Sequence, residues 1–206
     1  MKLIENIRKK HIVILILVLL LTLPLPLTAL WEYCREPSFE EMAIRKKVVE
    51  TAEGWLGCNE ADGSHQAIID LYNTQEVLPR SYTVTYEDSW CATFGSAVAM
   101  KCGLTDIIPT ECSCEQQIAL FRELGRWQER DTYLPQTGDY IFYDWEGSLF
   151  RSNNGWSDHV GIVVDTFGPF LKVIEGNKDD SVAYRYVFIL HPGIRGYGLP
   201  DYESKA

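Results

Sequence analysis

The hydrophobic and polar positions along the chain change their period near residue 138. Before that point, apolar residues recur at steps of three and four, which is typical of helices with one buried face. After it, apolar and polar residues alternate in short runs, which is typical of strands. The chain between residues 38 and 138 is therefore predicted to be mainly helical, and the part that follows to form a sheet.

Serine caps and glycine stops give the approximate ends of the predicted helices. The clearest start is the capping box of Ser38 and Glu41, which opens a helix that ends near Gly57. A second helix has Cys91 in its first turn and Gly103 as its stop. The remaining two are a helix at about 65–72, capped by Ser64, and one opened by Ser113 with Gln116 and stopped by Gly125.

The strand signal predicts four strands, at 140–145, 159–164, 171–175 and 182–189. The second and third are joined through Phe167-Gly168-Pro169, a turn-forming sequence, and so make a hairpin. Helices followed by antiparallel strands predict an α+β fold, with N-terminal helices packed on a C-terminal antiparallel sheet. Residues 38–206 are long enough for one such domain with a single core.

Residues 1–31 have the pattern of an export segment. Arg8, Lys9 and Lys10 precede the apolar run 12–23, which leads into a Pro- and Leu-rich stretch. The segment is either a cleaved signal peptide or a membrane anchor, because 12–31 is long enough to span a bilayer with the positive residues inside. Both alternatives predict that the domain works outside the cytoplasmic membrane, either secreted or anchored on its outer side.

Charge and cysteine content narrow the range of partners. The chain has a net charge of −10, and because the leader is basic the remaining domain is more acidic still, which excludes nucleic acid as a partner. Six cysteines are present, but no histidine or second cysteine pair supports zinc at Cys112 and Cys114. Glu60, Asp62 and Ser64 are only a fragment of a calcium loop. No metal or cofactor is expected, and the oligomeric state stays open.

The candidate nucleophile is Cys91. If Asp88 or Ser89 caps its helix, the thiol lies where unpaired N–H groups and the helix macrodipole favour an anion, so that thiolate is favoured over thiol. An Asp88 that is not engaged in capping would act in the opposite direction and raise the pKa of the thiol.

The candidate base is His159, at the start of the predicted hairpin. A turn centred on Phe167 sets His159 opposite Glu175, whereas a turn centred on Gly168 sets it opposite Asn177 on the same face of the sheet. Either partner would hold the tautomer of the ring and stabilise the imidazolium, leaving the other nitrogen to face the sulfur. Both residues therefore stay candidates for the third member of the site.

These segments resemble the CHAP domains, the cysteine, histidine-dependent amidohydrolases/peptidases related to NlpC-type and papain-like cysteine hydrolases. The resemblance covers most of residues 39–190 and consists of four short motifs in order: Trp90-Cys91-Ala92-Thr93-Phe94, Gly138-Asp139-Tyr140-Ile141-Phe142-Tyr143, Asp158-His159-Val160-Gly161-Ile162-Val163 and Ile174-Glu175-Gly176-Asn177.

The resemblance implies a papain-like fold with Cys91 as nucleophile, His159 as base and Glu175 orienting it, with Asn177 as a further contributor. It also implies an exported hydrolase that cuts an amide or peptide bond of bacterial peptidoglycan, as an amidase or an endopeptidase. Papain-like enzymes often have a glutamine before the cysteine as an oxyanion donor, and the preceding residues here, Asp88, Ser89 and Trp90, supply none.

Two aromatic residues are candidates for substrate contact. Trp90 precedes the nucleophile, and Trp156 ends a polar stretch just before His159, so both could stack on sugar rings; large aromatic residues are otherwise core residues. Two other classes of protein stay open. The domain could be a catalytically silent wall-binding or scaffold module, or a thiol-redox or metal protein that uses Cys102, Cys112 and Cys114.

Overall fold

The computed structural model describes residues 37–129, 133–145 and 156–206. The predicted leader at 1–31 lies outside these residues. Residues Ser38–Ala206 form one compact unit. None of the helices within the described ranges has the length and apolar character needed to cross a membrane.

Four α-helices precede most of the sheet in the described part of the chain. They are α3 (Phe39–Glu53), α4 (Gln66–Asn73), α5 (Cys91–Cys102) and α6 (Cys114–Glu123), with 3-10 turns η1 (Pro79–Ser81) and η3 (Tyr202–Lys205). The six strands are β1 (Trp127–Glu129), β2 (Tyr140–Tyr143), β3 (His159–Phe167), β4 (Phe170–Lys178), β5 (Ser181–Phe188) and β6 (Ile194–Gly198).

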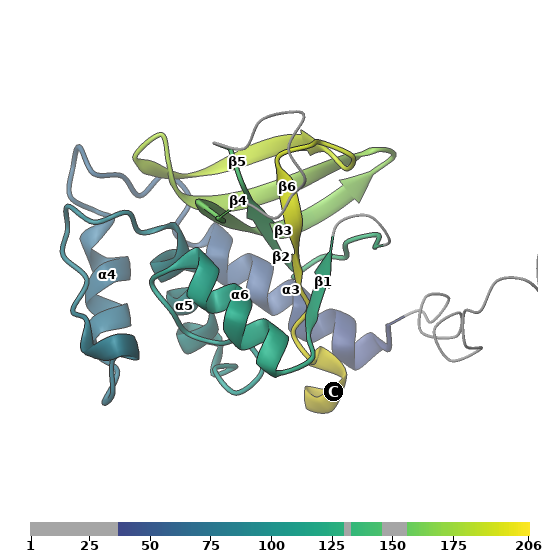
Figure 1. Ribbon diagram of the computed structural model, residues 1–206, viewed down its shortest axis with the longest axis horizontal. Coiled ribbons are helices and arrows are strands. Elements are labelled where there is room, and N and C mark those ends of the chain that lie inside the picture. Colours follow the sequence, from purple (N-terminus) through teal and green to yellow (C-terminus); the bar gives the residue numbers. More distant parts are fainter. Residues whose placement is uncertain (1–36, 130–132, 146–155) are drawn as a thin grey trace, which may run out of the picture. The chain divides into compact units, whose positions relative to one another are not determined.

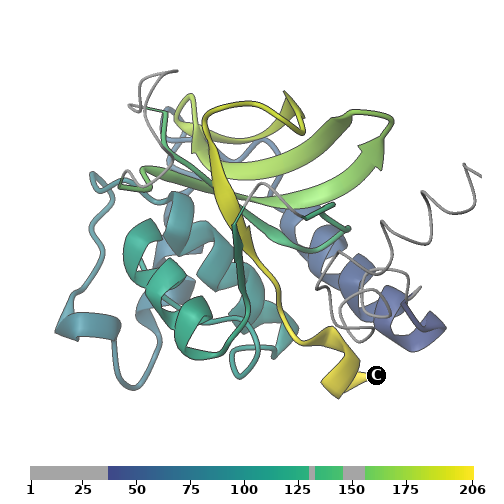
Figure 2. The ribbon, with the colours of Figure 1, turned by 45° about the vertical axis from the view of Figure 1, so that its right-hand side comes forward.

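The strands form one antiparallel sheet in the order β1-β6-β2-β3-β4-β5. The helices lie along one side of this sheet, as both ribbon views show (Figures 1 and 2). The buried apolar residues between helices and sheet make the larger of two core clusters. This arrangement confirms the predicted α+β fold class, with N-terminal helices packed on a C-terminal antiparallel sheet.

Two strands, β1 and β6, were not predicted from the sequence. β6 contains Gly196 and Gly198, and glycine is depleted in strands. Its neighbours explain the glycines, because a Cβ at Gly196 would lie 2.6 Å from the Trp127 ring and one at Gly198 would lie 2.4 Å from the Phe121 ring. Close packing of aromatic rings on this strand therefore overrides its weak intrinsic preference.

The helix caps agree only in part with the sequence. Ser38 accepts a hydrogen bond from the backbone N–H of Glu41 at 3.0 Å, as predicted. Ser64 and Ser113 make no such bond to α4 and α6. Ser64 instead accepts the N–H of Asn59 at 2.9 Å, within a local turn. The predicted cap at Ser64 was wrong because this turn uses its hydroxyl.

Helix α5 lies at the centre of the helical layer and contacts α3, α4, α6, β3 and β4. Its first turn approaches β4 closely at Gly176, where an added Cβ would lie only 2.4 Å from the Cβ of Phe94. A side chain at position 176 would push the start of α5 away from the sheet. The glycine therefore sets how near Cys91, the first residue of α5, comes to the strands.

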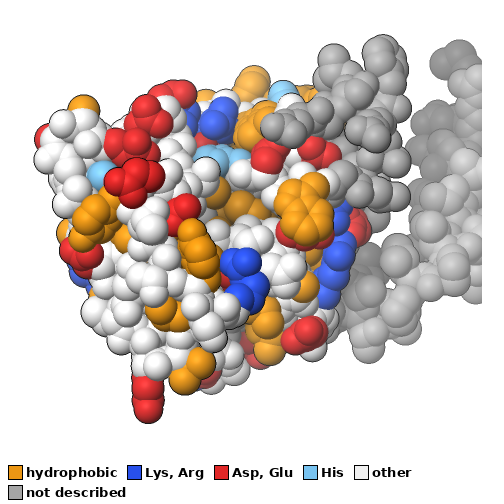
Figure 3. Space-filling view, turned by 60° about the vertical axis from the view of Figure 1, so that its left-hand side comes forward, with side chains coloured by type: hydrophobic (Ala, Val, Ile, Leu, Met, Phe, Trp, Pro, Cys, Tyr) orange, Lys and Arg blue, Asp and Glu red, His pale blue; other side chains and the backbone are white. Residues whose placement is uncertain are grey.

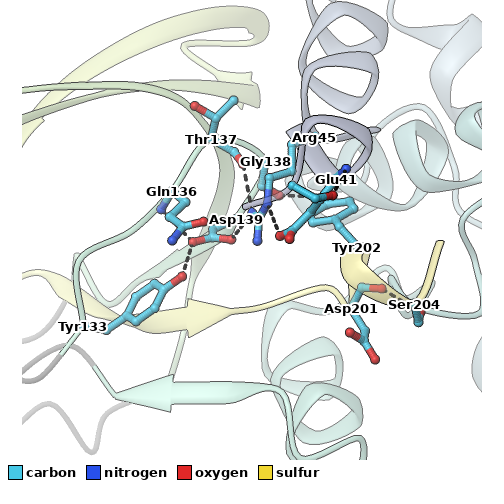
Figure 4. A network of polar contacts seen from close by, with 11 residues as sticks. Glu41, Arg45, Tyr133, Gln136, Thr137, Gly138, Asp139, Asp201, Tyr202 and Ser204 are labelled. Atoms are coloured by element: carbon cyan, nitrogen blue, oxygen red, sulfur yellow. Dashed lines mark hydrogen bonds and ion pairs between the residues drawn. The ribbon is translucent and has the colours of Figure 1, made fainter. Parts of the chain in front are cut away.

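A buried polar cluster joins α3 to the loop before β2 (Figure 4). We call it the Arg45 cluster: Glu41, Arg45, Tyr133 and Asp139. Arg45 donates to Glu41 and to Asp139, each at 2.9 Å, while Asp139 also accepts the Tyr133 hydroxyl at 2.6 Å. Asp139 is fully buried and in addition accepts the N–H of Gln136, so it is both a turn residue and half of an ion pair.

Candidate active site

Cys91 is the first residue of α5 and is almost buried, with 6% of its surface exposed. The residue before the helix, Trp90, makes no side-chain cap, and neither Asp88 nor Ser89 takes that place. The carboxylate of Asp88 instead accepts the Tyr82 hydroxyl at 2.9 Å and the N–H of Thr85 at 2.7 Å. The predicted cap was wrong, but the carboxylate of Asp88 is engaged by these local hydrogen bonds.

His159 begins β3 and reaches Glu175 on β4, with Nε2 and Oε2 3.0 Å apart. The two residues are not directly opposite each other. Gly161 is the backbone partner of Glu175, so His159 and Glu175 are diagonal neighbours on one face of the sheet. The hairpin has a two-residue turn at Gly168-Pro169 and a bulge near Val164, and beyond the bulge its register is the one predicted for a turn centred on Gly168. The contact of His159 with Glu175 is therefore diagonal, and the register predicted for a turn centred on Phe167 was wrong.

Gly161 makes this diagonal contact possible. A Cβ at position 161 would lie 2.5 Å from Cγ1 of Val173 and 2.7 Å from Cγ of Glu175. Without a side chain at Gly161, the side chain of Glu175 occupies that space, on the face that carries His159. The glycine of the Asp-His-Val-Gly segment is therefore explained by contact geometry rather than by backbone conformation.

Arg185 on β5 holds Glu175 from the other side. Its Nε lies 2.7 Å and 2.9 Å from the two carboxylate oxygens of Glu175. Glu175 itself is fully buried, so both of its charged neighbours act on it with little screening. Arg185 also packs over the Trp145 ring, with its guanidinium carbon 4.7 Å from the ring centroid, which fixes the position of the guanidinium.

These contacts favour the charged forms of His159, Glu175 and Arg185. Burial alone would raise the pKa of Glu175, but hydrogen bonds and positive charge from His159 and Arg185 outweigh it and lower that pKa. Burial would likewise lower the pKa of His159, yet the hydrogen bonds and negative charges of Cys91 and Glu175 raise it to about 10. The ring is therefore an imidazolium at neutral pH.

The pKa of Cys91 lies well below its ordinary value. The largest cause is a hydrogen bond from Cys114, which together with a hydrogen bond and positive charge from His159 overcomes the effect of burial. The two sulfur atoms lie 3.6 Å apart. Because Glu175 occupies Nε2 of His159, the contact between the ring and Cys91 falls to Nδ1. Both pKa shifts favour the thiolate–imidazolium form of the pair.

Asn177, the alternative partner of His159, has no hydrogen bond to the ring among the described contacts. It lies where the β4–β5 pairing shifts and has a left-handed backbone conformation, with φ of 53°. The pairing of β3 with β4 ends at Gly161 and Glu175, two residues short of Asn177. In this conformation, Glu175 is the partner.

The two aromatic candidates differ in exposure. Trp90 is fully buried; its Nε1 donates to Glu60 at 2.9 Å and its ring packs near His65. The prediction that Trp90 contacts substrate is therefore corrected, since the ring is a core residue with no surface to offer. Trp156 is 70% exposed and lies three residues before His159, where it is free to meet a ligand.

Sequence reasoning missed two residues of the site, Arg185 and Cys114. A signal for Arg185 was present, because it is the one charged residue in the alternating set Ala183, Arg185, Val187 and Ile189. Nothing in the spacing of Cys114 pointed to Cys91, because the contact depends on how the first turn of α6 packs against that of α5.

Comparison with known proteins adds little to this picture. No protein-family model matches the chain, and neither does any curated protein. Among solved structures, an NlpC/P60 family protein from Bacillus cereus ATCC 10987 matches with a TM-score of 0.42 and 13% identity. The alignment covers 79% of this chain and 40% of that protein, so this chain spans less than half of its length. The chemistry of the site therefore has to come from its own geometry.

Proposed function

We propose that this protein is a cysteine hydrolase that cleaves an amide or peptide bond of bacterial peptidoglycan. The observation that carries the proposal is the convergence of Cys91, His159 and Glu175 from α5, β3 and β4 into one chain of contacts. A nucleophile at a helix start, a base in contact with it and a buried acid behind the base are the parts that covalent catalysis needs.

In the proposed reaction, the Cys91 thiolate attacks the scissile carbonyl carbon, and the N–H of Cys91 at the start of α5 donates to the oxyanion. The imidazolium of His159 then gives its proton to the leaving amine as the acyl-enzyme forms. His159, now neutral, takes a proton from the water that attacks the thioester, and the free thiolate returns. Glu175 keeps the ring oriented and stabilises its positive charge in both steps.

The choice of peptidoglycan as substrate is supported by the resemblance of the four motifs to CHAP domains. Around the histidines on the face shown in Figure 3, acidic, basic and hydrophobic side chains are interspersed. The exposed Trp156, three residues before His159 in the sequence, offers an apolar ring to a sugar or peptide. Whether the enzyme is an amidase or an endopeptidase depends on the bond that the substrate presents to Cys91.

The basic and apolar pattern of residues 1–31 supports a location outside the cytoplasmic membrane, where peptidoglycan lies. We propose either secretion or anchoring through 12–31. Fractionation of cells that express the full chain, followed by N-terminal sequencing of the mature protein, separates cleavage from anchoring. Recovery of the full-length protein only in the cytosol would contradict both.

The decisive test is incubation of the protein with purified peptidoglycan and mass spectrometry of the released fragments. Cys91→Ser is expected to lower turnover at least about 1,000-fold, because a hydroxyl is not ionised by His159 as a thiol is. Cys102→Ser is the matched control, since Cys102 ends the same helix and its sulfur contacts Thr51 rather than the site. The new end groups also identify the bond that is cut.

The same experiment separates the two alternative classes. A folded wild-type protein that binds peptidoglycan but releases nothing would be the silent wall-binding module. The thiol-redox or metal alternative required Cys102, Cys112 and Cys114 to act together, but in the structure they contact different partners: Thr51, Arg80 and Cys91, respectively. A thiol count and metal analysis of the purified protein complete that comparison.

A further inference from the structure

The site contains a second thiol that the proposed mechanism does not use. Cys114 is the first residue of α6, and its sulfur lies 3.6 Å from that of Cys91. Both side chains are nearly buried, with residue exposures of 7% and 6%. A polar contact between two sulfurs in a site shielded from water is stronger than the same contact in solution.

We propose that Cys114 is a catalytic-site residue whose S–H group donates a hydrogen bond to the Cys91 thiolate. This inference rests on the proposed function only for its consequence in catalysis, because the hydrogen bond exists in the resting protein.

The surroundings of the two sulfurs decide which one keeps the proton. Cys91 faces the His159 imidazolium, which favours the anion there. Each of the two cysteines is the first residue of a helix, so the helix macrodipole favours an anion at both and does not distinguish them. Cys114 faces Cys91 and the negative charge of Asp158, the residue before β3, and both disfavour a second anion there. Cys91 is therefore the acceptor and Cys114 the donor.

The other charged groups near the pair fit this assignment. Glu175 on β4 acts on Cys91 only through His159, whose Nε2 it occupies. Glu115, next to Cys114 on α6, accepts the N–H of Ser157 at 3.1 Å, and the guanidinium of Arg195 on β6 lies 3.7 Å from it. Neither contact places next to the Cys114 sulfur a positive charge that would stabilise an anion there.

A donated hydrogen bond has two opposite effects on a nucleophile. It lowers the pKa of the Cys91 thiol, so more thiolate is present at low pH, but it also ties up a lone pair and reduces the intrinsic reactivity of that thiolate. Loss of the donor should therefore slow Cys91 at low pH and speed it at high pH. A change that only loosened packing would not make the two profiles cross.

The test is the rate at which iodoacetamide alkylates Cys91 between about pH 4 and pH 9, with mass spectrometry to follow the peptide that contains Cys91. In Cys114→Ala the apparent pKa of Cys91 should rise by about one unit, the size expected for one hydrogen bond to a charged group. The plateau rate at high pH should rise about threefold. Cys114→Val also lacks a donor but keeps more of the volume, and it should behave like Cys114→Ala.

Two further variants make the result specific. Cys114→Ser restores a donor, so its profile should return toward that of the wild type. Cys102→Ala removes an equally buried thiol from the far end of α5 and should leave the profile unchanged. Superimposable profiles for the wild type and a folded Cys114→Ala or Cys114→Val would overturn the proposal. So would a Cys114→Ser profile that is identical to that of Cys114→Ala, because packing alone would then explain the shift.

A second measurement needs no variant. Hydrogen peroxide should oxidise the Cys91 thiolate to a sulfenic acid with release of hydroxide; the Cys114 thiol then attacks that sulfur, and the hydroxyl leaves with the thiol proton as water. The expected product is a disulfide between residues 91 and 114, which a thiol reductant reverses. If brief treatment of the folded wild type yields the sulfenic acid without this linkage, the contact itself is refuted.

Alkylation does not involve hydrolysis, so the two proposals can fail separately. A shifted and crossing profile in a protein that leaves peptidoglycan intact would support the hydrogen bond and refute the hydrolase. If the wild type cleaves peptidoglycan but substitution of Cys114 leaves the alkylation profile unchanged, the hydrolase would be supported and the hydrogen bond refuted.

Discussion

Within the residues that the structure describes, the Arg45 cluster and the site around Cys91 both bury charged groups, but only the second includes an atom that can still form a covalent bond. In the Arg45 cluster, each oxygen of the Asp139 carboxylate already accepts a hydrogen bond from the protein: from Arg45 on one side, and from Tyr133 and Gln136 on the other. In the site around Cys91, the Glu175 carboxylate is satisfied in the same way, by His159 and Arg185, but the chain of contacts continues through the ring to a sulfur.

The difference shows how a buried ion pair becomes reactive. In the Arg45 cluster one cation lies between two carboxylates, whereas in the Cys91 site one carboxylate lies between two cations. Both arrangements are costly to bury unless they are fully paired. The Arg45 cluster ends in backbone and hydroxyl groups, so it can only hold α3 against the loop before β2. The Cys91 site ends in an atom that can form a covalent bond, and the side chain of His159 keeps 12% of its surface exposed.

The largest expected effect comes from breaking the Arg45 cluster. Asp139→Ala leaves the Arg45 guanidinium buried without its main partner, so the free energy of unfolding should fall by about 3–5 kcal/mol. Chemical denaturation measures this change. Glu50→Ala is the control, since it removes an exposed ion pair with Lys46 from the same helix and should cost less than about 0.5 kcal/mol. Equal losses in the two variants would show that the Arg45 cluster is not a structural ion pair.

The next effect separates Glu175 from Asn177. Glu175→Gln removes the charge that stabilises the His159 imidazolium, and turnover on peptidoglycan should fall about 100-fold or more. Asn177→Ala should change turnover by less than about threefold, because Asn177 makes no hydrogen bond to the ring. Steady-state rates with both variants decide the matter, and the opposite ranking would make Asn177 the orienting residue.

Gly161→Ala tests how tightly the diagonal contact is built. The added methyl group would lie 2.7 Å from Cγ of Glu175, so we expect a loss of about 1–3 kcal/mol in stability. Turnover should fall as well, since Glu175 has to move away from His159. Gly54→Ala, at the C-terminal end of α3, meets nothing closer than the Thr51 carbonyl oxygen at 3.3 Å and should cost much less than Gly161→Ala. Thermal unfolding and turnover of both variants give the comparison.

The smallest effect concerns the alkylation rate of Cys91, which should stay nearly constant over the pH range in which the alkylation rate of a free thiol changes most. The lowered pKa of Cys91 keeps it ionised in weak acid, and the pKa of His159, raised to about 10, keeps the ring protonated in weak base. The ion pair therefore forms as pH rises through the pKa of Cys91 and is lost only near pH 10. Between about pH 6 and pH 8 the alkylation rate of Cys91 should change less than twofold, whereas that of free cysteine, with a pKa of about 8.5, should rise steeply.

Several features of the fold were accessible from the sequence because local patterns control them. The capping box at Ser38, the stop at Gly103 and the alternation along β5 each depend on residues within one element. The strand β6 was missed because Gly196 and Gly198 are explained only by rings from α6 and β1 that pack onto them, and β1 is a strand of three residues. The burial of Trp90 was missed for the same reason, since its partners, Glu60 and His65, come from another part of the chain.

By itself, the sequence determined which residue types were available for chemistry and on which elements they lie: a cysteine at a helix start, and a histidine and a glutamate on two strands of a hairpin. Only the tertiary structure decided that Glu175 reaches His159 diagonally across Gly161, that Arg185 holds Glu175, and that Cys114 contacts Cys91. The physical reason is the distance over which each kind of interaction acts. Caps and periodicity act over a few residues along the chain, whereas hydrogen bonds and charges at the site act through space between elements whose packing no local pattern records.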